Sequence, residues 1–249
     1  MQAVLYVCHG SRVTEACHEA VSFVKRCQAG INVPIQEICF IELAEPNIAQ
    51  GIAACINKGA TNIVVIPVLL LKANHLKHDI PQEIARANKH YPQITITLTQ
   101  PFGVHEKIVQ VIAERIREQQ VSVDNNTMVL LVGRGSSDPD VKNDLQQIAR
   151  LLHEHIPIPR IEVCFLAAAQ PSLEAGLDDA SRSSCQKVFV VPCLLFTGVL
   201  MKRLTNKLKR ITTPEKQFIL CNYLGYHPLL QELLHERVSE LTNLQTKRG

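Results

Sequence analysis

Short apolar runs alternate with stretches of helical periodicity along the first half of the chain. Runs rich in Val, Ile and Leu predict strands at residues 3–8, 36–41, 62–70 and 95–99. Between them, apolar residues at helical spacing predict helices at residues 14–28, 47–58, 77–89 and 104–117. Because strand–helix alternation is typical of a parallel sheet covered by helices on both faces, the pattern predicts an α/β fold.

The second half of the chain repeats the first. With a shift of 125 residues, Gly10-Ser11 matches Gly135-Ser136 and Glu37 matches Glu162; later the shift falls to 122, which pairs His105 with His227. Two unrelated α/β domains would not share so many positions in one register. We therefore predict two tandem duplicated domains, residues 1–120 and 121–249, with the polar segment 119–127 as linker and a ligand cleft between the domains.

Composition narrows the class of protein. The chain has 249 residues, 46% of them hydrophobic, and a net charge of +3, which is too small for a general nucleic-acid binder. No apolar run approaches the roughly 20 residues that span a bilayer, and the first residues lack the pattern of a signal peptide, so we expect a cytoplasmic protein that binds no membrane. Nine scattered cysteines without a C-x-x-C pair indicate buried apolar residues rather than disulfides or zinc ligands.

Candidate metal ligands follow the predicted strands of the first half. His9 comes directly after the first strand and Glu42 after the second, and the segment 72–78, which contains His75, comes after the third. The carboxyl ends of parallel strands meet at one edge of a sheet, so these side chains are expected to converge. Imidazole and carboxylate together suit a divalent ion such as Fe²⁺ or Co²⁺.

The repeat acts as an internal control for these candidates. At the matching positions of the second half, His9 is replaced by Arg134, Glu42 by Ala167 and His75 by Leu200. A lone histidine after a strand is usually a turn residue, but three candidates that disappear together while the scaffold persists favour a functional site. We therefore predict that the first domain alone carries the metal site.

Other polar residues receive different interpretations. His105 and His227 occur in both halves, which favours a structural role such as a turn or a cap, and His78 is expected to contact solvent or substrate. Cys8 should point to the opposite side of its strand from His9, into the core. The basic run at residues 202–210 is either a solvated helix face or a surface that attracts an anionic ligand. Neither half has a phosphate-binding or dinucleotide-binding glycine motif, so no organic cofactor is expected.

These motifs together resemble the class II chelatases of the CbiX and SirB type, and the resemblance covers essentially the whole chain. The segments that carry it are Val7-Cys8-His9-Gly10-Ser11-Arg12, Phe40-Ile41-Glu42-Leu43-Ala44-Glu45-Pro46, Pro67-Val68-Leu69-Leu70-Leu71-Lys72-Ala73-Asn74-His75 and Asp79-Ile80-Pro81. One departure is Ala73, where relatives often have glycine.

The resemblance implies the class II chelatase fold and ATP-independent insertion of Fe²⁺ or Co²⁺ into sirohydrochlorin. His9 and His75 would bind the metal and accept pyrrole protons, with Glu42 in support. The absence of a histidine-rich stretch or a cysteine-rich tail favours iron, with Co²⁺ or Ni²⁺ able to occupy the same site. Because the substrate carries many carboxylates, basic residues are candidates for binding it: Arg12, Lys72, Arg134 and Arg203.

Three alternatives stay open to different degrees. A cobaltochelatase of cobalamin synthesis would use the same residues, and a non-catalytic carrier of metal or tetrapyrrole would bind without turnover. A histidine phosphatase is disfavoured, because that chemistry needs arginine directly before the histidine, where this chain has Cys8. We expect a monomer whose ligands are sirohydrochlorin and a divalent metal.

Overall fold

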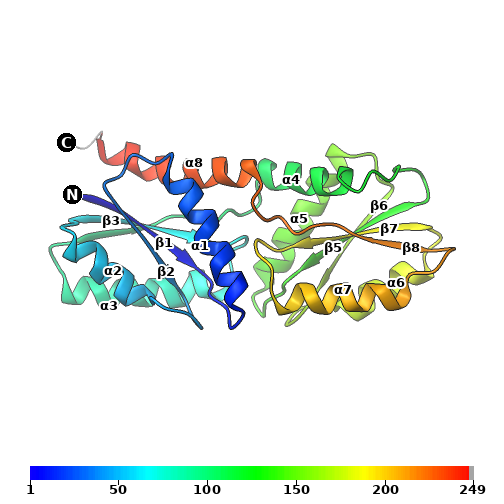
Figure 1. The fold of residues 1–249 in the computed structure, drawn as a ribbon, viewed down its shortest axis with the longest axis horizontal. Helices are drawn as coiled ribbons and strands as arrows, with labels where there is room; N and C mark the ends of the chain where they lie inside the picture. Colours follow the sequence, from blue (N-terminus) through cyan, green and yellow to red (C-terminus); the bar gives the residue numbers. More distant parts are fainter. Residues whose placement is uncertain (247–249) are drawn as a thin grey trace. The chain divides into compact units, whose positions relative to one another are not determined.

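The fold consists of two similar halves (Figure 1). The computed structural model describes residues 1–246, without the side chains of His75, Val199, Leu200 and residues 241–246. The first half contains β1 (Gln2–Cys8), α1 (Thr14–Gln28), β2 (Ile35–Phe40), α2 (Ile48–Asn57), β3 (Asn62–Val68), the π-helical turn η1 (His75–Asp79), α3 (Ile80–His90), β4 (Thr95–Leu98) and α4 (Glu106–Arg117). The second half contains β5 (Thr127–Gly133), α5 (Pro139–His155), β6 (Arg160–Phe165), α6 (Leu173–Arg182), β7 (Lys187–Cys193), α7 (Val199–Ile211), β8 (Gln217–Leu220) and α8 (Pro228–Thr246).

Each half forms one parallel sheet with the same strand order. The first sheet runs β2-β1-β3-β4 and the second β6-β5-β7-β8. The register is also repeated: Val4 lies opposite Gln36 and Val64, and its counterpart Val129 lies opposite Ile161 and Phe189, each shifted by the same 125 residues. The predicted α/β duplication is therefore confirmed at the level of individual backbone pairs.

The predicted elements agree with the observed ones within a few residues, except where a helix was predicted at 77–89. There the chain first forms the π-helical turn η1, and the α-helix α3 begins only at Ile80. Pro81 occupies the first turn of α3. Proline has no N–H to donate and its ring crowds the preceding turn, so it is accommodated at the start of an α-helix rather than inside one.

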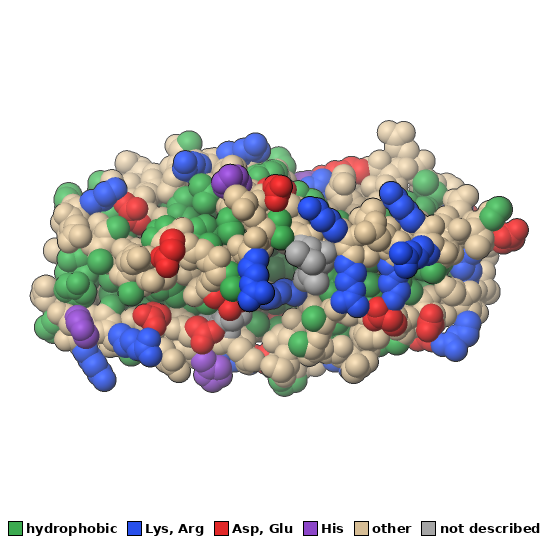
Figure 2. All heavy atoms as spheres, turned by 60° about the horizontal axis from the view of Figure 1, so that its bottom comes forward, with side chains coloured by type: hydrophobic (Ala, Val, Ile, Leu, Met, Phe, Trp, Pro, Cys, Tyr) green, Lys and Arg blue, Asp and Glu red, His purple; other side chains and the backbone are tan. Residues whose placement is uncertain are grey.

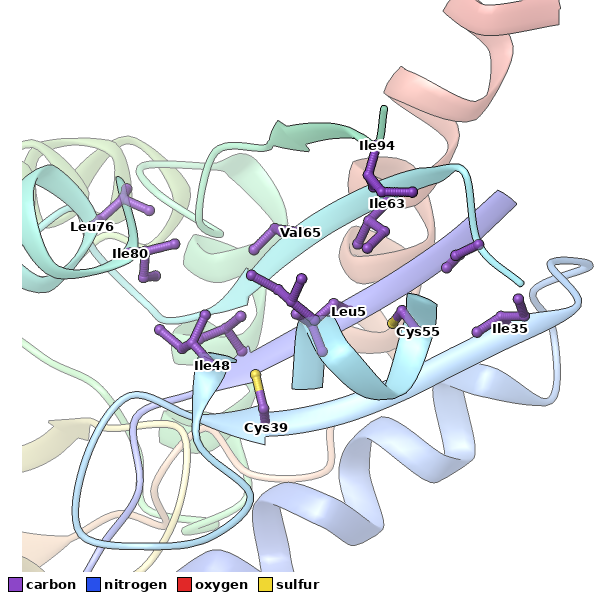
Figure 3. Close-up of a cluster of buried hydrophobic side chains, with 14 of the residues drawn as sticks. Leu5, Ile35, Cys39, Ile48, Cys55, Ile63, Val65, Leu76, Ile80 and Ile94 are labelled. Atoms are coloured by element: carbon purple, nitrogen blue, oxygen red, sulfur yellow. The ribbon is translucent and has the colours of Figure 1, made fainter. Parts of the chain in front are cut away.

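The core of the first sheet lies between the strands and helices α2 and α3. Figure 3 shows side chains from the sheet, such as Leu5 and Val65, meeting Ile48 and Cys55 of α2 and Ile80 of α3. Across residues 1–246, all nine cysteines are free thiols and eight of them are buried. The interpretation of these cysteines as apolar residues of the core is confirmed for those eight, while Cys17 is partly exposed.

The compact units do not follow the predicted boundary at residue 120, because two helices are exchanged between the halves. One unit comprises Met1–Gly103 with α8, and the other comprises Val104–His227, which includes α4. Helix α4 packs on α5 and β7, while α8 packs on α1 and β3. Each exchanged helix buries an apolar stripe, represented by Ile108 and Ile112 in α4 and by Leu230 and Leu234 in α8. Periodicity shows that a helix has such a stripe but not which sheet the stripe will cover.

None of the helices in the described part of the chain is long and apolar enough to cross a membrane.

Candidate active site

The carboxyl end of the first sheet brings His9 and Glu42 together. Pairing between β1 and β2 continues past the ends of both strands: Ile41 N–H donates to the Cys8 carbonyl at 2.9 Å, and Glu42 N–H donates to the His9 carbonyl at 3.2 Å. These bonds fix the loop after β2 against the loop after β1. The two predicted site residues, far apart in sequence, therefore become neighbours through backbone hydrogen bonds alone.

Glycine is required directly after His9. Gly10 has a φ of +89°, a region that residues with a Cβ rarely adopt, and a Cβ placed there would lie 1.8 Å from the Glu42 carbonyl oxygen. The close approach of the two loops thus depends on the missing side chain. In the sequence His9-Gly10-Ser11, the histidine is therefore the candidate ligand and the glycine is required by the backbone geometry.

The imidazole of His9 is oriented by two oxygen atoms. Its Nδ1 lies 3.0 Å from the Gly10 carbonyl oxygen and 3.7 Å from Oε1 of Glu42. A carbonyl can only accept, so Nδ1 carries the proton of this hydrogen bond, and in the neutral ring the lone pair resides on Nε2. The side chains of His9 and Glu42 are 24% and 41% exposed, so the pair is accessible from solvent. An imidazole held in this tautomer by neighbouring oxygens is typical of a metal ligand.

His75 occupies the first position of η1. The turn is closed by Leu76 N–H and Lys77 N–H, which both donate to the Ala73 carbonyl, at 2.9 and 3.2 Å. The imidazole of His75 lies outside the described part of the structure, so its convergence with His9 stays a prediction. Among the residues whose side chains are described, no group of three or more His, Cys, Asp or Glu side chains could hold a metal ion.

A recess of about 490 Å³ adjoins Glu42 within the first unit. It lies between the loop after β2, the start of α2 and helix α3, and it is lined by Ile41, Glu42, Asn47, Ile48, Ala49, Asp79, Gln82, Glu83 and Arg86. Glu42 therefore borders both His9 and a hollow of the surface.

Cys8 is not positioned to act as a ligand. Its side chain is fully buried, and burial raises the pKa of the thiol to about 12. A neutral thiol is a poor metal ligand, because it is the thiolate that binds. The expectation that Cys8 belongs to the core is confirmed.

The second unit repeats the backbone arrangement without the candidate ligands. Leu166 N–H donates to the Gly133 carbonyl and Ala167 N–H to the Arg134 carbonyl, both at 3.0 Å. A Cβ on Gly135, which also has a φ of +89°, would lie 1.7 Å from the Ala167 carbonyl oxygen. The bonds and the glycine match those around His9, so the loop geometry belongs to the fold. The imidazole of His9 and the carboxylate of Glu42 are present only in the first unit.

The four basic residues predicted to bind substrate are all exposed. Arg12 and Lys72 belong to the first unit, and Arg134 and Arg203 belong to the second. Arg203 lies 3.5 Å from Glu174, which Lys207 also contacts at 2.5 Å, and these cations lower the pKa of the Glu174 carboxyl group. Figure 2 shows several Lys and Arg side chains close together in the half of the molecule that holds α7.

The two histidines assigned a structural role have one. His105 is the N-cap of α4, where its Nδ1 accepts a hydrogen bond from Lys107 N–H at 3.1 Å. His227 is buried and its Nε2 lies 2.7 Å from Oε2 of Glu114. Both side chains therefore contact the exchanged helix α4, through different ring nitrogens and different partners.

A protein-family model described as CbiX matches this chain twice, over residues 3–119 and 128–241. The chain belongs to the CbiX family. The family resemblance inferred from the motifs is thereby confirmed, and the two matches correspond to the two halves of the duplication.

Two curated CbiX-type relatives come from one organism. A sirohydrochlorin ferrochelatase of Priestia megaterium is 52% identical over 97% of this chain and 91% of the relative. A sirohydrochlorin cobaltochelatase of the same organism is 38% identical over 96% of this chain and 80% of the relative. Both relatives align with nearly the whole chain, so the similarity includes both units.

Solved structures of SirB have the same fold. SirB from Bacillus subtilis with Fe³⁺ superimposes with a TM-score of 0.88 at 42% identity, covering 96% of this chain and 94% of SirB. SirB from subspecies spizizenii in complex with cobalt gives a TM-score of 0.83 at 41% identity, with the same coverage. The class II chelatase fold expected from the sequence is therefore confirmed.

Sequence reasoning overlooked one pair of residues in this CbiX-type fold. Arg115 and Arg237 are related by the shift of 122 residues, as are Glu118 and Glu240 beside them. In both places the arginine bonds to the glutamate, at 2.5 Å. The recurrence of Arg-x-x-Glu at matching positions was the signal that could have identified them.

Proposed function

We propose that this chain is a sirohydrochlorin ferrochelatase, which inserts Fe²⁺ into sirohydrochlorin without ATP to give sirohaem. The observation that carries the proposal is the 52% identity over 97% of the chain to a protein of that name, against 38% to the cobaltochelatase of the same organism. The pairing of His9 with Glu42, in the first unit only, supplies residues suited to this chemistry.

Metal insertion exchanges a pair of pyrrole protons for one divalent cation inside a stiff ring. The enzyme must therefore hold the metal weakly enough to release it, and must accept protons as the metal enters. A neutral imidazole suits both tasks, because it binds borderline metals and its ordinary pKa of about 6.5 permits proton transfer near neutral pH.

In this proposal His9 presents Nε2 to the incoming metal or to a pyrrole proton. The hydrogen bond from Nδ1 to the Gly10 carbonyl keeps the ring in the required tautomer. Glu42, 3.7 Å from the same nitrogen, stabilises the positive charge that the ring acquires when it accepts a proton. His75 serves as the second ligand and proton acceptor, approaching from the turn that follows β3.

The basic side chains are assigned to the substrate. Sirohydrochlorin is a polycarboxylate, and arginine binds carboxylates with two parallel hydrogen bonds. We assign this role to Arg12 and Lys72 in the first unit and to Arg134 and Arg203 in the second. Arg203 would exchange its contact with Glu174 for a substrate carboxylate. The protein would act in the cytoplasm as a monomer.

The second candidate function is that of a cobaltochelatase. It is favoured by the 38% identical relative of that name and by the structure of SirB in complex with cobalt. The same ligands would serve, because imidazole and carboxylate discriminate little between Fe²⁺ and Co²⁺, and Ni²⁺ would also fit them.

An anaerobic absorbance assay tests the proposal. The purified chain is mixed with sirohydrochlorin and either Fe²⁺ or Co²⁺, and the rate of the spectral change is compared with the rate without enzyme. We expect acceleration with both ions and a higher kcat/KM with Fe²⁺. A higher value with Co²⁺ would favour the cobaltochelatase, and binding of the tetrapyrrole without acceleration would identify a carrier instead.

A further inference from the structure

The exchanged helix α8 carries an arginine that is held against the loop between β4 and α4. The side chain of Arg237 is 16% exposed. Its Nε donates to the Pro101 carbonyl and its Nη2 to the Phe102 carbonyl, both at 3.0 Å, while Nη1 donates to Glu240 at 2.5 Å. One guanidinium group thus binds two successive backbone carbonyls and is itself oriented by a carboxylate. This fork geometry is specific to arginine, since an ammonium group cannot reproduce it.

The loop that Arg237 binds is in turn bonded to the segment that leads to His75. Phe102 N–H donates to the Leu69 carbonyl at 3.1 Å, and Gly103 N–H donates to the Leu70 carbonyl at 2.7 Å. Phe102 is fully buried, which limits the movement of the loop, and Gly103 has a φ of +71°. Four residues separate Leu70 from His75.

The second unit contains a related arrangement at matching positions, in which the arginine binds one backbone carbonyl instead of two and, among the described residues, its Nε has no hydrogen-bond partner. The side chain of Arg115, in the exchanged helix α4, is 13% exposed and donates to Glu118 and to the Leu224 carbonyl, each at 2.5 Å. Leu224 N–H then donates to the Leu194 carbonyl at 2.9 Å, and Gly225 N–H to the Leu195 carbonyl at 3.1 Å. There the bonded segment leads to residue 200, where the chain has leucine in place of His75.

We propose that Arg237 is a positioning residue of the chelatase site, acting through loop 101–103 on the segment that carries Lys72 and His75. The inference rests on the proposed function, because it concerns the placement of a proposed ligand. By fixing the start of this segment, Arg237 limits the positions that the His75 backbone can adopt. Ligands displaced by even 1 Å lose much of their effect on a reaction, so this restriction raises the rate of metal insertion.

The test compares Arg237→Met with the matched variant Arg115→Met. Methionine retains an apolar side chain for packing but removes every donor. Both variants should lose thermal stability, and Arg237→Met should lose more, because Arg237 makes one more hydrogen bond than Arg115 does. We expect Arg237→Met to lower kcat about tenfold with KM within about twofold, and Arg115→Met to keep kcat within about twofold, by analogy with outer-shell residues of metal sites.

Two further readouts separate positioning from a general loss of stability. With Co²⁺ alone as the probe, Arg237→Met should change the visible absorption of the bound ion, whereas Arg115→Met should leave it unaltered. Amide hydrogen exchange should accelerate at residues 69–79 in Arg237→Met and at residues 194–204 in Arg115→Met. If Arg237→Met fails to fold, Arg237→Lys replaces it, with a smaller loss of kcat expected and the same shift in exchange.

Equal losses of kcat in the two methionine variants would overturn the proposal, and so would an Arg237 variant with wild-type kcat and exchange. Failure of the proposed function gives a different result: the wild-type chain would then show no insertion, while faster exchange at residues 69–79 in Arg237→Met would still show that Arg237 restrains the segment.

Discussion

The two units of this protein share one backbone arrangement but carry different chemical groups at the same edge of the sheet. In both, a glycine with a φ of +89° allows the loop after the first strand to touch the loop after the second. In the first unit this contact joins His9 and Glu42, and in the second it joins Arg134 and Ala167. The glycine and the backbone bonds are thus requirements of the fold, whereas the imidazole and the carboxylate are not. Because the fold does not require the imidazole and the carboxylate, their presence in the first unit indicates a functional role.

The helices that follow the third strand of each sheet, α3 and α7, differ in their charged residues. Helix α7 has five basic residues and no acidic one in its sequence, whereas α3 has Glu83 beside Arg86 and Lys89. Helix α7 therefore offers more positive charge to an anionic ligand than α3 does. In the proposed function only the first unit binds the metal, while basic residues of both units bind the carboxylates of the tetrapyrrole.

The largest effect is expected from removing His9. His9→Ala should lower the rate of insertion at least 1000-fold, on the order of what the loss of a group acting as both ligand and base costs an enzyme. The fold should survive, because the second unit holds the same loop without a histidine. The measurement is the anaerobic insertion assay, with circular dichroism to verify folding.

Arg134→Ala is the matched control for His9→Ala. It alters the same position of the repeat and should change mainly KM for sirohydrochlorin, by about tenfold or less, since it removes a proposed carboxylate contact. If His9→Ala and Arg134→Ala behaved alike, the assignment of the metal site to the first unit would be wrong.

The next largest effect concerns Glu42. Glu42→Gln keeps the shape of the side chain but removes the negative charge 3.7 Å from Nδ1 of His9, so we expect kcat to fall about 10- to 100-fold. Glu45→Gln is the control, because Glu45 is exposed on the same loop and its Oε2 accepts a hydrogen bond from Asn47 N–H. Unchanged turnover in Glu42→Gln would remove Glu42 from the site.

Much of the fold was predictable because it depends on local patterns. Apolar runs located all four strands of the first half, and the repeat transferred them to the second, with a shift of 125 residues for the first three strands and of 122 for the fourth. The exchange of α4 and α8 was not predictable in this way. An amphipathic helix has the same periodicity whichever sheet it covers, and the drop of the shift to 122, which already applies to β4 and β8, does not reveal the partner of either helix.

The site was predictable to the extent that it is built at strand ends. His9 and Glu42 were identified as candidates because each follows a strand and has no counterpart in the repeat, and the structure places them 3.7 Å apart. Arg237 was missed because it acts through loop 101–103, and its contacts with Pro101 and Phe102 join positions more than 130 residues apart in the sequence. Hydrogen bonds of that range leave no local pattern, and only the recurrence of Arg-x-x-Glu in both halves points to this arginine.

The third prediction concerns the two glycines that shape the loops, rather than the candidate ligands. Gly10→Ala and Gly135→Ala should each destabilise the protein by about 2–3 kcal/mol, because both place a Cβ within 2 Å of a carbonyl oxygen at a positive φ. Only Gly10→Ala should also lower kcat, by about tenfold, since it separates His9 from Glu42. Thermal unfolding and the insertion assay measure the two effects. Equal losses of kcat would show that the loop serves stability alone.

The smallest effect is expected at Cys8, whose counterpart in the second unit is Gly133. Cys8→Ala should keep insertion within about twofold, because burial holds the pKa of the thiol at about 12 and no thiolate is present near neutral pH to bind metal.

The unfolded chain would ionise the Cys8 thiol near its ordinary pKa of about 8.5, while the folded chain would not. Its contribution to stability is therefore complete below that pH and is lost as the pH rises toward 12. Cys8→Ala should accordingly lose stability less steeply than the wild type in alkaline solution, measured by thermal unfolding between pH values of about 8 and 11. A large loss of insertion in Cys8→Ala would instead show that the thiol is a ligand. The metal site of the first unit would then include a residue of the core as well as residues at the carboxyl end of the sheet.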